Sequence, residues 1–286
     1  MGAPHTATPQ ITPGALAVPN GDASSVGTFR DLIDARIYLR GVAWGQLVWS
    51  GRMAVSGSAT APVITVGVIE TVALRYPGDA ASDATGVWRP YYTTGETTLG
   101  LAHVPSADKT GSPAALYADA WYYVYVGSDG TTTPQWEVSR TPPTESGTPT
   151  VARLWKRGQT SNWRYLGFFR TDGSGVPEPL RRVGGLTVFA TPRLVVQNGP
   201  SGGTSNANLS VATAVPPHVH HLRARVAVAT TGTSVIAVNA PGASASVGSS
   251  VNLVELYSDD AGLRYSAAVN GGESASLSLY VQSCQE

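Results

Sequence analysis

Charged residues, lysine and cysteine are scarce in this sequence. Only 13% of the 286 residues are charged, against roughly 25% in a typical globular protein. The 19 basic residues balance the 19 acidic ones, so the formal net charge is zero. A neutral chain offers no electrostatic excess for nucleic acid or for an anionic membrane surface. We therefore expect neither as a partner.

Cys284 is the only cysteine, and long apolar runs are absent. A single cysteine excludes an intrachain disulfide. No apolar run approaches the ~20 residues that a membrane-spanning helix needs, and the first residues lack the basic and then apolar composition of a secretory signal. We expect no disulfide framework and no membrane insertion.

Apolar and small residues are plentiful. Hydrophobic residues make up 42% of the chain, which is enough for the core of one large domain or of a few small ones. Glycine, alanine, serine and threonine take the place of the missing charges. This composition favours tightly paired sheets and contacts between subunits.

The amino-terminal residues 1–50 are expected to form an extended arm followed by one short helix. Prolines recur through residues 1–27, and they disfavour packed regular elements. Thr28 is a candidate N-cap, and apolar residues follow it at helical spacing. These residues are Phe29, Leu32, Ile33 and Ile37. The apolar stripe could pack on its own domain or on copies of itself.

Strand patterns dominate from Gly41 onward. Residues 63–69 form a β-branched run, which is typical of a strand. Turn signals separate such runs, and they allow the chain to reverse into antiparallel hairpins. These signals are Pro77-Gly78-Asp79, Ser128-Asp129-Gly130, Thr171-Asp172-Gly173 and residues 258–262.

The run Trp121-Tyr-Tyr-Val-Tyr-Val126 predicts a strand with large apolar groups on both faces. Side chains alternate between the two faces of a sheet, so three aromatic residues on one side oppose tyrosine and valine on the other. Such a strand must be covered on both sides. The cover could come from the same chain, as in the core of a monomeric sandwich, or from neighbouring subunits.

A domain boundary is expected between residues 183 and 184, next to Gly184-Gly185, and residues 197–206 read as a long loop or linker. Beyond this boundary several short strands at sandwich spacing predict a small antiparallel β-sandwich or jelly roll. The expected strands are residues 222–228, 235–238, 251–257, 263–265 and 277–281. The predicted organisation is an arm and helix (1–50), a central aromatic β-domain (51–183) and a terminal β-sandwich (184–286).

The order of four motifs resembles a module of fibre and tail proteins of tailed bacteriophages. The resemblance covers roughly residues 110–286, and its weight comes from order and spacing. Its motifs are Trp121–Val126, Val138-Ser139 with Pro142-Pro143, Trp163-Arg-Tyr-Leu-Gly167 and Arg170-Thr-Asp-Gly173, with Val215-Pro216-Pro217 entering the terminal domain.

The resemblance implies a structural protein of the virion rather than an enzyme. It implies a homotrimer whose residues 1–50 attach to other virion proteins and whose residues 184–286 face a host-surface glycan or protein, or another virion protein. Two alternatives stay open, namely a capsid decoration or head-fibre protein and a tailspike that cleaves polysaccharide. Tyr257, Tyr265 and Tyr280 are available for glycan contacts, and core packing explains them equally well.

No catalytic signature and no cofactor motif stand out. Asp259 and Asp260 are adjacent, so on a strand they would point to opposite faces, and in a turn they are ordinary turn residues. A tailspike would use carboxylates that are paired in space, which a sequence does not reveal. We expect no catalytic residue and no bound cofactor.

His218 and His220 form the sharpest candidate site. Residues i and i+2 of a strand share a face, and a threefold axis would gather both histidines from three chains into a six-nitrogen, near-octahedral metal cage. His221 would point to the opposite face. Exposed or structural histidines at the entrance of a strand are the alternative.

Overall fold

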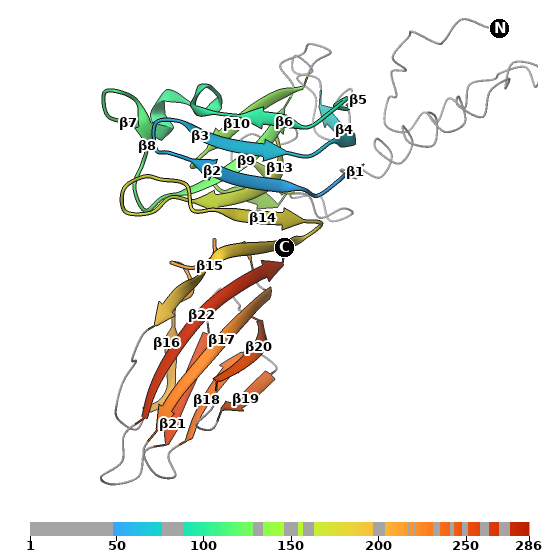
Figure 1. Cartoon of the computed structure of the whole chain (residues 1–286). Coiled ribbons are helices and arrows are strands. Elements are labelled where there is room, and N and C mark those ends of the chain that lie inside the picture. Colours follow the sequence, from blue (N-terminus) through green and yellow to red (C-terminus); the bar gives the residue numbers. More distant parts are fainter. Residues whose placement is uncertain are drawn as a thin grey trace, which may run out of the picture. The chain divides into compact units, whose positions relative to one another are not determined.

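In the computed structural model of the chain, almost every regular element is a β-strand (Figure 1). Every strand pair recorded among the described residues of the two units below is antiparallel, which confirms the mostly-β, antiparallel class. The expected arm and short helix lie outside the described residues. The structure describes residues 48–75, 88–127, 134–145, 154–156, 163–196, 204–216, 218–219, 221–230, 235–240, 243–247, 251–257, 263–268 and 275–285.

The chain divides into two compact units, Met1–Glu178 and Pro179–Glu286. The sequence suggested a boundary five residues later, beside Gly184-Gly185. In the structure these glycines form the turn of a hairpin, where Gly184 has a φ of 63°, a left-handed value that favours glycine. The hairpin joins β14 (Leu180–Val183) to β15 (Leu186–Val196), so both strands belong to the second unit.

The first unit contains a five-stranded sheet, two three-stranded sets of paired strands and a two-stranded ribbon. The largest sheet has the order β10-β9-β13-β12-β11. Two three-stranded sets, β1-β4-β5 and β2-β3-β6, accompany it. The strands of the five-stranded sheet are β10 (Gln135–Ser139), β9 (Trp121–Gly127), β13 (Trp163–Arg170), β12 (Leu154–Lys156) and β11 (Pro143–Glu145). The strands of the two three-stranded sets are β1 (Val48–Trp49), β4 (Ile69–Arg75) and β5 (Trp88–Tyr91), and β2 (Met53–Gly57), β3 (Pro62–Val66) and β6 (Thr97–Leu99).

Short elements fill the segment between β6 and β9. Two single-turn 3-10 helices, η1 (Leu101–His103) and η2 (Ser106–Asp108), precede a ribbon of β7 (Lys109–Thr110) and β8 (Ala115–Leu116). No helix in the described part of the chain has the length and apolar character needed to cross a membrane.

The β-branched run 63–69 is not one strand, which corrects the sequence-based expectation. Strand β3 ends at Val66, and β4 begins at Ile69. Between them Gly67 donates its backbone N–H to the Arg52 carbonyl at 2.8 Å, and a Cβ at this glycine would overlap the Ser50 side chain. The backbone therefore approaches residues 50–52 too closely for the strand to continue unbroken.

The aromatic strand β9 is covered on both faces by its own chain. Residues 122–126 are 0–3% exposed, so neither face of the strand is left to solvent. On one face the Tyr122 ring stacks on Phe169 of β13, with centroids 5.3 Å apart. On the other face Trp121 meets Phe168 edge to face at 5.5 Å. The strand predicted from the sequence is confirmed, and neighbouring subunits are not needed to cover it.

A bulge in β13 sets which aromatic residues share a face. The register shifts between Tyr165, opposite Tyr125, and Gly167, opposite Val124, so Leu166 is the extra residue. In a regular strand without the bulge, Tyr165 and Phe168 would point to opposite sides, because they are three residues apart and side chains alternate along a strand. With it both lie on the same face as Tyr123 and Tyr125.

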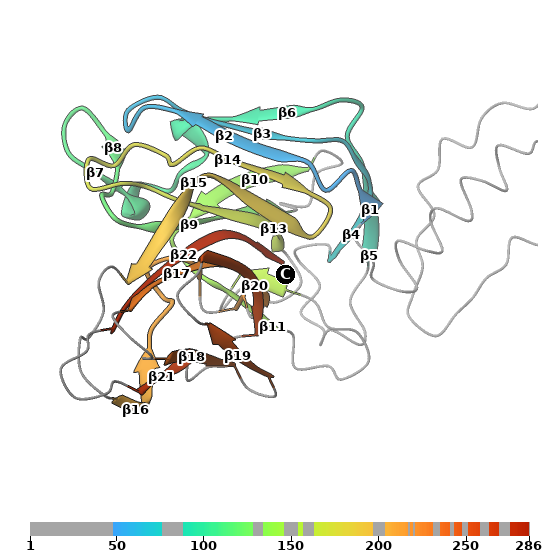
Figure 2. The same cartoon turned by 60° about the horizontal axis from the view of Figure 1, so that its bottom comes forward.

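The second unit contains two sheets whose strand order is that of an eight-stranded jelly roll. One has the order β20-β17-β22-β15, extended by β14, and the other has the order β16-β21-β18-β19 (Figures 1 and 2). Numbered one to eight from β15 to β22, the orders are 6-3-8-1 and 2-7-4-5, the nested pairing of two Greek keys. The additional strands are β16 (Thr204–Leu209), β17 (His221–Thr230), β18 (Val235–Ala240), β19 (Ala243–Val247), β20 (Val251–Tyr257), β21 (Leu263–Ala268) and β22 (Ala275–Gln285).

Strands were predicted at the positions of β17, β18, β20, β21 and β22, and the structure confirms them with longer bounds for most. The expected loop at residues 197–206 is wrong at its end. Strand β16 begins at Thr204 and pairs with β21 through Thr204, opposite Ala267, and Ala207, opposite Tyr265. Backbone pairing to β21 therefore outweighs the low strand propensity of serine and asparagine in β16.

Candidate functional site

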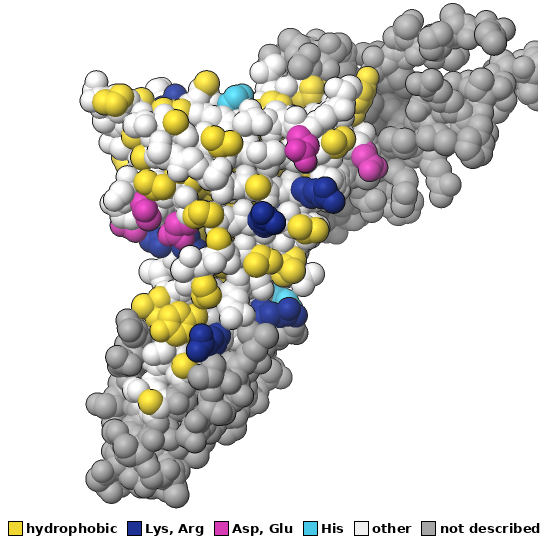
Figure 3. Space-filling view, viewed as in Figure 1, with side chains coloured by type: hydrophobic (Ala, Val, Ile, Leu, Met, Phe, Trp, Pro, Cys, Tyr) yellow, Lys and Arg dark blue, Asp and Glu magenta, His cyan; other side chains and the backbone are white. Residues whose placement is uncertain are grey.

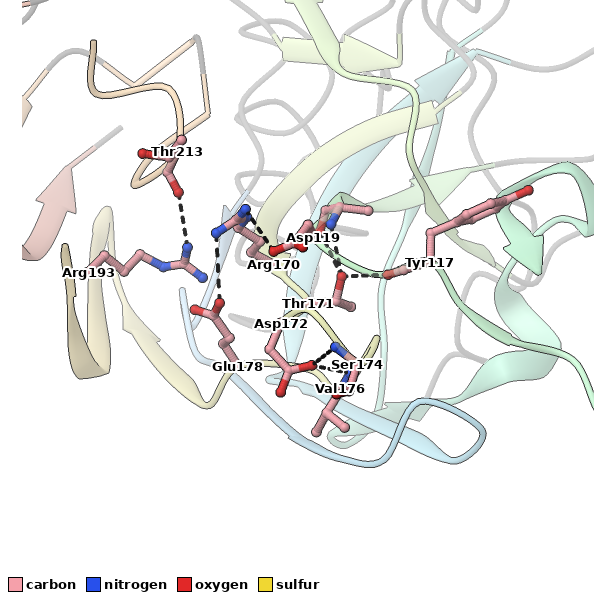
Figure 4. Close-up of polar contacts among 11 residues, drawn as sticks. Tyr117, Asp119, Arg170, Thr171, Asp172, Ser174, Val176, Glu178, Arg193 and Thr213 are labelled. Atoms are coloured by element: carbon pink, nitrogen blue, oxygen red, sulfur yellow. Dashed lines mark hydrogen bonds and ion pairs between the residues drawn. The ribbon is translucent and has the colours of Figure 1, made fainter. Parts of the chain in front are cut away.

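The Arg170–Gly173 motif of the resemblance forms a turn held by buried hydrogen bonds (Figure 4). The Thr171 hydroxyl accepts the Ala120 N–H at 3.0 Å and donates to the Tyr117 carbonyl at 2.6 Å. The Thr171 side chain is fully buried. This threonine anchors the segment before β9 to the end of β13, which is a structural role.

The flanking residues of the motif are used in the same way. The Asp172 carboxylate accepts the backbone N–H groups two and four residues further on, at 2.8 and 2.9 Å, and so caps the turn. Arg170 forms an ion pair with Asp119 at 3.2 Å and approaches Glu178 at 4.0 Å. The three acidic groups thus serve a turn and a cation.

Asp108 ties the loop before β9 to the edge strand β10. Its carboxylate accepts the Ser139 hydroxyl at 2.8 Å and the Arg140 N–H at 3.2 Å. Its carbonyl accepts the Tyr122 hydroxyl at 2.9 Å. The Arg140 guanidinium lies over the Tyr117 ring at 4.2 Å. The polar groups of this segment therefore hold the loop in place.

The tyrosines of β9 are not suited to proton transfer near neutral pH. Burial raises the pKa of Tyr123 from 10.0 to about 12. Burial raises the pKa of Tyr125 as well, with the nearby Tyr123 and Glu137 adding to the effect. The Tyr125 hydroxyl donates to the Thr141 carbonyl at 2.7 Å. These rings serve packing.

The candidate metal ligands are only partly described. His218 is half-buried next to a turn in which the Val219 N–H donates to the Pro216 carbonyl at 3.0 Å. His220 lies outside the described residues, as do Asp259 and Asp260. Within the described ranges no group of three or more His, Cys, Asp or Glu side chains could hold a metal ion. The trimer-axis cage stays a prediction.

A different candidate site lies on one face of the sheet in the second unit. Residues directly opposite on antiparallel strands share a face, so the register defines rows across β14, β15, β22 and β17. We call the solvent side of these rows the outer face. Its rows are Val183–Leu186–Gln285–His221, Arg181–Val188–Ser283–Arg223 and Leu194–Tyr280–Arg225.

The opposite side of the same strands is the core of the unit. The row Arg182–Thr187–Cys284–Leu222 is buried. The guanidinium of Arg193, which is also buried, lies 5.0 Å from the Phe189 ring and donates to the Thr213 carbonyl at 3.4 Å (Figure 4). Burial therefore separates the two faces at most positions; the exception is Ser283, which lies in an outer row and is only 5% exposed.

The outer face carries basic side chains and few acidic ones. Residues 179–254 contain five arginines and no Asp or Glu. Arg181, Arg223 and Arg225 are exposed on the outer face, while the other two arginines are in the core. Glu255 of β20 lies opposite Arg223 in the register. In Figure 3 the coloured side chains over β15, β22 and β17 are hydrophobic, basic or histidine.

The outer face also exposes apolar side chains next to the arginines. Val183 is 64% exposed, and Leu186, Val188 and Leu194 are 39–44% exposed. All four come from the hairpin β14–β15. A strand such as β15 normally keeps such residues in a core, so their exposure indicates a surface that contacts something.

Sequence reasoning did not find this face. The strand at residues 222–228 was predicted, but no binding role was predicted for the arginines at positions 223 and 225. Two signals were available, namely the i, i+2 spacing of these arginines and the 76 residues without a carboxylate from Pro179 to Val254. The contribution of Arg181 depends on long-range register, which a single sequence does not give.

The chain matches no protein-family model, and no curated protein sequence is significantly similar to it.

Proposed function

We propose that this protein is a structural subunit of a bacteriophage virion, a homotrimeric fibre-like or tail-type appendage. Residues 1–50 attach to other virion proteins. The terminal β-unit is distal and contacts the host surface or another virion protein. The chain acts by binding and carries no catalytic residue.

The observation that carries the proposal is the strand order of residues 186–285. Jelly rolls of eight strands are recurrent in viral capsid and lectin domains, which assemble or bind glycans. The motif order of residues 110–286, which resembles phage fibre and tail proteins, points to the same class. Fold alone does not define function, so the proposal also uses the exposed face of this unit.

The location of the chain tests the proposal. Antibodies raised against the full chain are expected to label purified particles of the phage that encodes it, at the tip of an appendage. Labelling over the capsid would support the head-fibre or decoration alternative instead. Absence of the chain from purified particles would contradict any virion role.

The tailspike alternative makes a separate chemical prediction. A cleaving enzyme releases soluble oligosaccharide from host polymer, whereas a binding appendage adsorbs to the polymer and leaves its length unchanged. We expect no change in polymer length after incubation with the purified protein. A steady release of oligosaccharide would contradict the non-enzymatic role.

The His218 and His220 metal site is tested by metal analysis of the purified oligomer. We predict stoichiometric metal that is lost when both histidines are changed to alanine, because six imidazole nitrogens would be replaced together. A protein without stoichiometric metal, or one whose metal survives the double change, would contradict the predicted trimer-axis metal site.

A further inference from the structure

We propose that the outer face of the second unit binds an anionic polysaccharide. The inference rests on the proposed function, in which this unit faces the host surface, and it names the ligand class and the residues. Arg181, Arg225 and Tyr280 are its central contacts.

Charge complementarity selects an anionic partner. Three arginines are exposed on this face, residues 179–254 contain no Asp or Glu, and Glu255 of β20 lies opposite Arg223 in the register. Arg225 lies opposite Leu253 and Tyr280, and Arg181 lies opposite Val188 on β15. An anionic ligand meets these cations without burying an unpaired charge.

The neutral groups between the arginines select a glycan. Strand β22 runs between β17 and β15, and its outer side presents a serine hydroxyl, a glutamine amide and a tyrosine ring. Hydroxyls and amides donate to and accept from sugar hydroxyls, and the ring offers an amphipathic surface for the face of a sugar. These residues are Ser278, Tyr280 and Gln285, all half-buried or exposed.

The spacing of the arginines selects a polymer. From Arg181 on β14 to Arg223 on β17 there are three strand spacings, or about 14 Å. From Arg223 to Arg225 the strand advances about 7 Å. An extended chain with repeated carboxylate or phosphate groups fits this array better than one small anion.

Binding by the purified full-length chain tests the inference. The probes are polygalacturonate, a glycerol phosphate teichoic acid, neutral dextran and duplex DNA, each titrated at low and at high salt. We expect binding to at least one of the two anionic glycans, weakening as salt screens the arginines, and none to dextran. Binding to neither glycan, equal binding to dextran, or stronger binding to DNA would overturn the inference.

Matched variants show whether the outer face is responsible. The double variant Arg181→Gln with Arg225→Gln is expected to weaken binding by about tenfold, the loss of two exposed charge-assisted contacts. Tyr280→Ser is expected to weaken it as well. Arg52→Gln, which changes an exposed arginine of the first unit, is the control and should stay within about twofold. Equal effects of the double variant and the control would overturn the assignment.

Solution mass separates this inference from the proposed function. If the double variant binds glycan normally but no longer assembles, the outer face is a contact between copies and the inference is overturned. If glycan binding fails while particle labelling and assembly hold, only the inference is lost. If the chain is a monomer and yet binds glycan through the arginines, the surface stands and the proposed assembly fails.

Discussion

Gly127, the last residue of β9, shows how one small residue positions an aromatic one. It lies opposite Trp163 at the start of β13, and a Cβ at this glycine would overlap the indole ring. The indole therefore covers the glycine and closes the end of the aromatic sheet. This arrangement explains why a glycine ends the run of large residues in β9.

We predict that Gly127→Ala lowers the free energy of unfolding by about 1–3 kcal/mol, because the tryptophan must leave its position or the strands must separate. Denaturant unfolding followed by tryptophan fluorescence measures this loss, since all seven tryptophans lie in the first unit. Gly95→Ala is the control, because nothing lies within 4 Å of its Cβ position. Equal losses in both variants would contradict the packing assigned to Trp163.

The buried Tyr123 predicts an alkaline limit to stability. Tyrosine in the unfolded chain ionises near pH 10, whereas burial raises the pKa of Tyr123 in the folded chain to about 12. Below pH 10 the ring is neutral in both states and its burial stabilises fully. As pH rises from 10 towards 12 only the unfolded chain ionises, so stability falls.

Unfolding free energies measured across this pH range test the point, with Tyr123→Phe as the comparison. The variant is expected to lose less stability between pH 10 and 12, because phenylalanine does not ionise. The same pH dependence in the variant and in the natural chain would show that Tyr123 ionises in the folded state or is not buried.

At the scale of elements, the sequence predicted those strands that are rich in β-branched and aromatic residues. The strand at Trp121–Val126 and several strands of the second unit were found by β-branched and aromatic residues. Strand β19 was missed because its residues Ala-Ser-Ala-Ser-Val are small and its place depends on pairing with β18.

The bulge at Leu166 and the outer face could not be predicted from the sequence, because both depend on how distant strands pair. A bulge reverses the alternation of the residues that follow it, and nothing local in Trp163–Arg170 specifies which residue is extra. Likewise Arg181 joins Arg223 only through the registers of three strand pairs. Long-range pairing is decided by the whole sheet.

Strand β22 offers an element-scale prediction through Cys284, which is 1% exposed and lies on the core side. We predict that this thiol reacts with a disulfide reagent only when the unit opens. Leu279→Ala removes a fully buried side chain from the same strand and should cost about 2–5 kcal/mol, so labelling should become faster.

Ser276→Ala on the other side of β22 is the control for this experiment, because Ser276 is only half-buried. Its labelling rate should match that of the unchanged chain. Fast labelling of Cys284 in the unchanged chain, or equal rates in both variants, would contradict the alternation of burial assigned to β22.

At the scale of the whole molecule, the aromatic strand β9 does not provide evidence for assembly into a trimer. Before the structure was known, the aromatic strand could be covered either by its own chain or by neighbours. Residues 122–126 are buried within one chain, so they no longer argue for a trimer. Among the described residues, the outer face of the second unit offers exposed apolar and basic side chains to a partner.

The mass of the purified chain at micromolar concentration tests the central claim most directly. A homotrimer has a mass of about 89 kDa, three times the 29.7 kDa of one chain. Sedimentation equilibrium is expected to give this value, because a closed threefold assembly has a defined end point. A single species of 29.7 kDa would contradict a free-standing trimeric appendage.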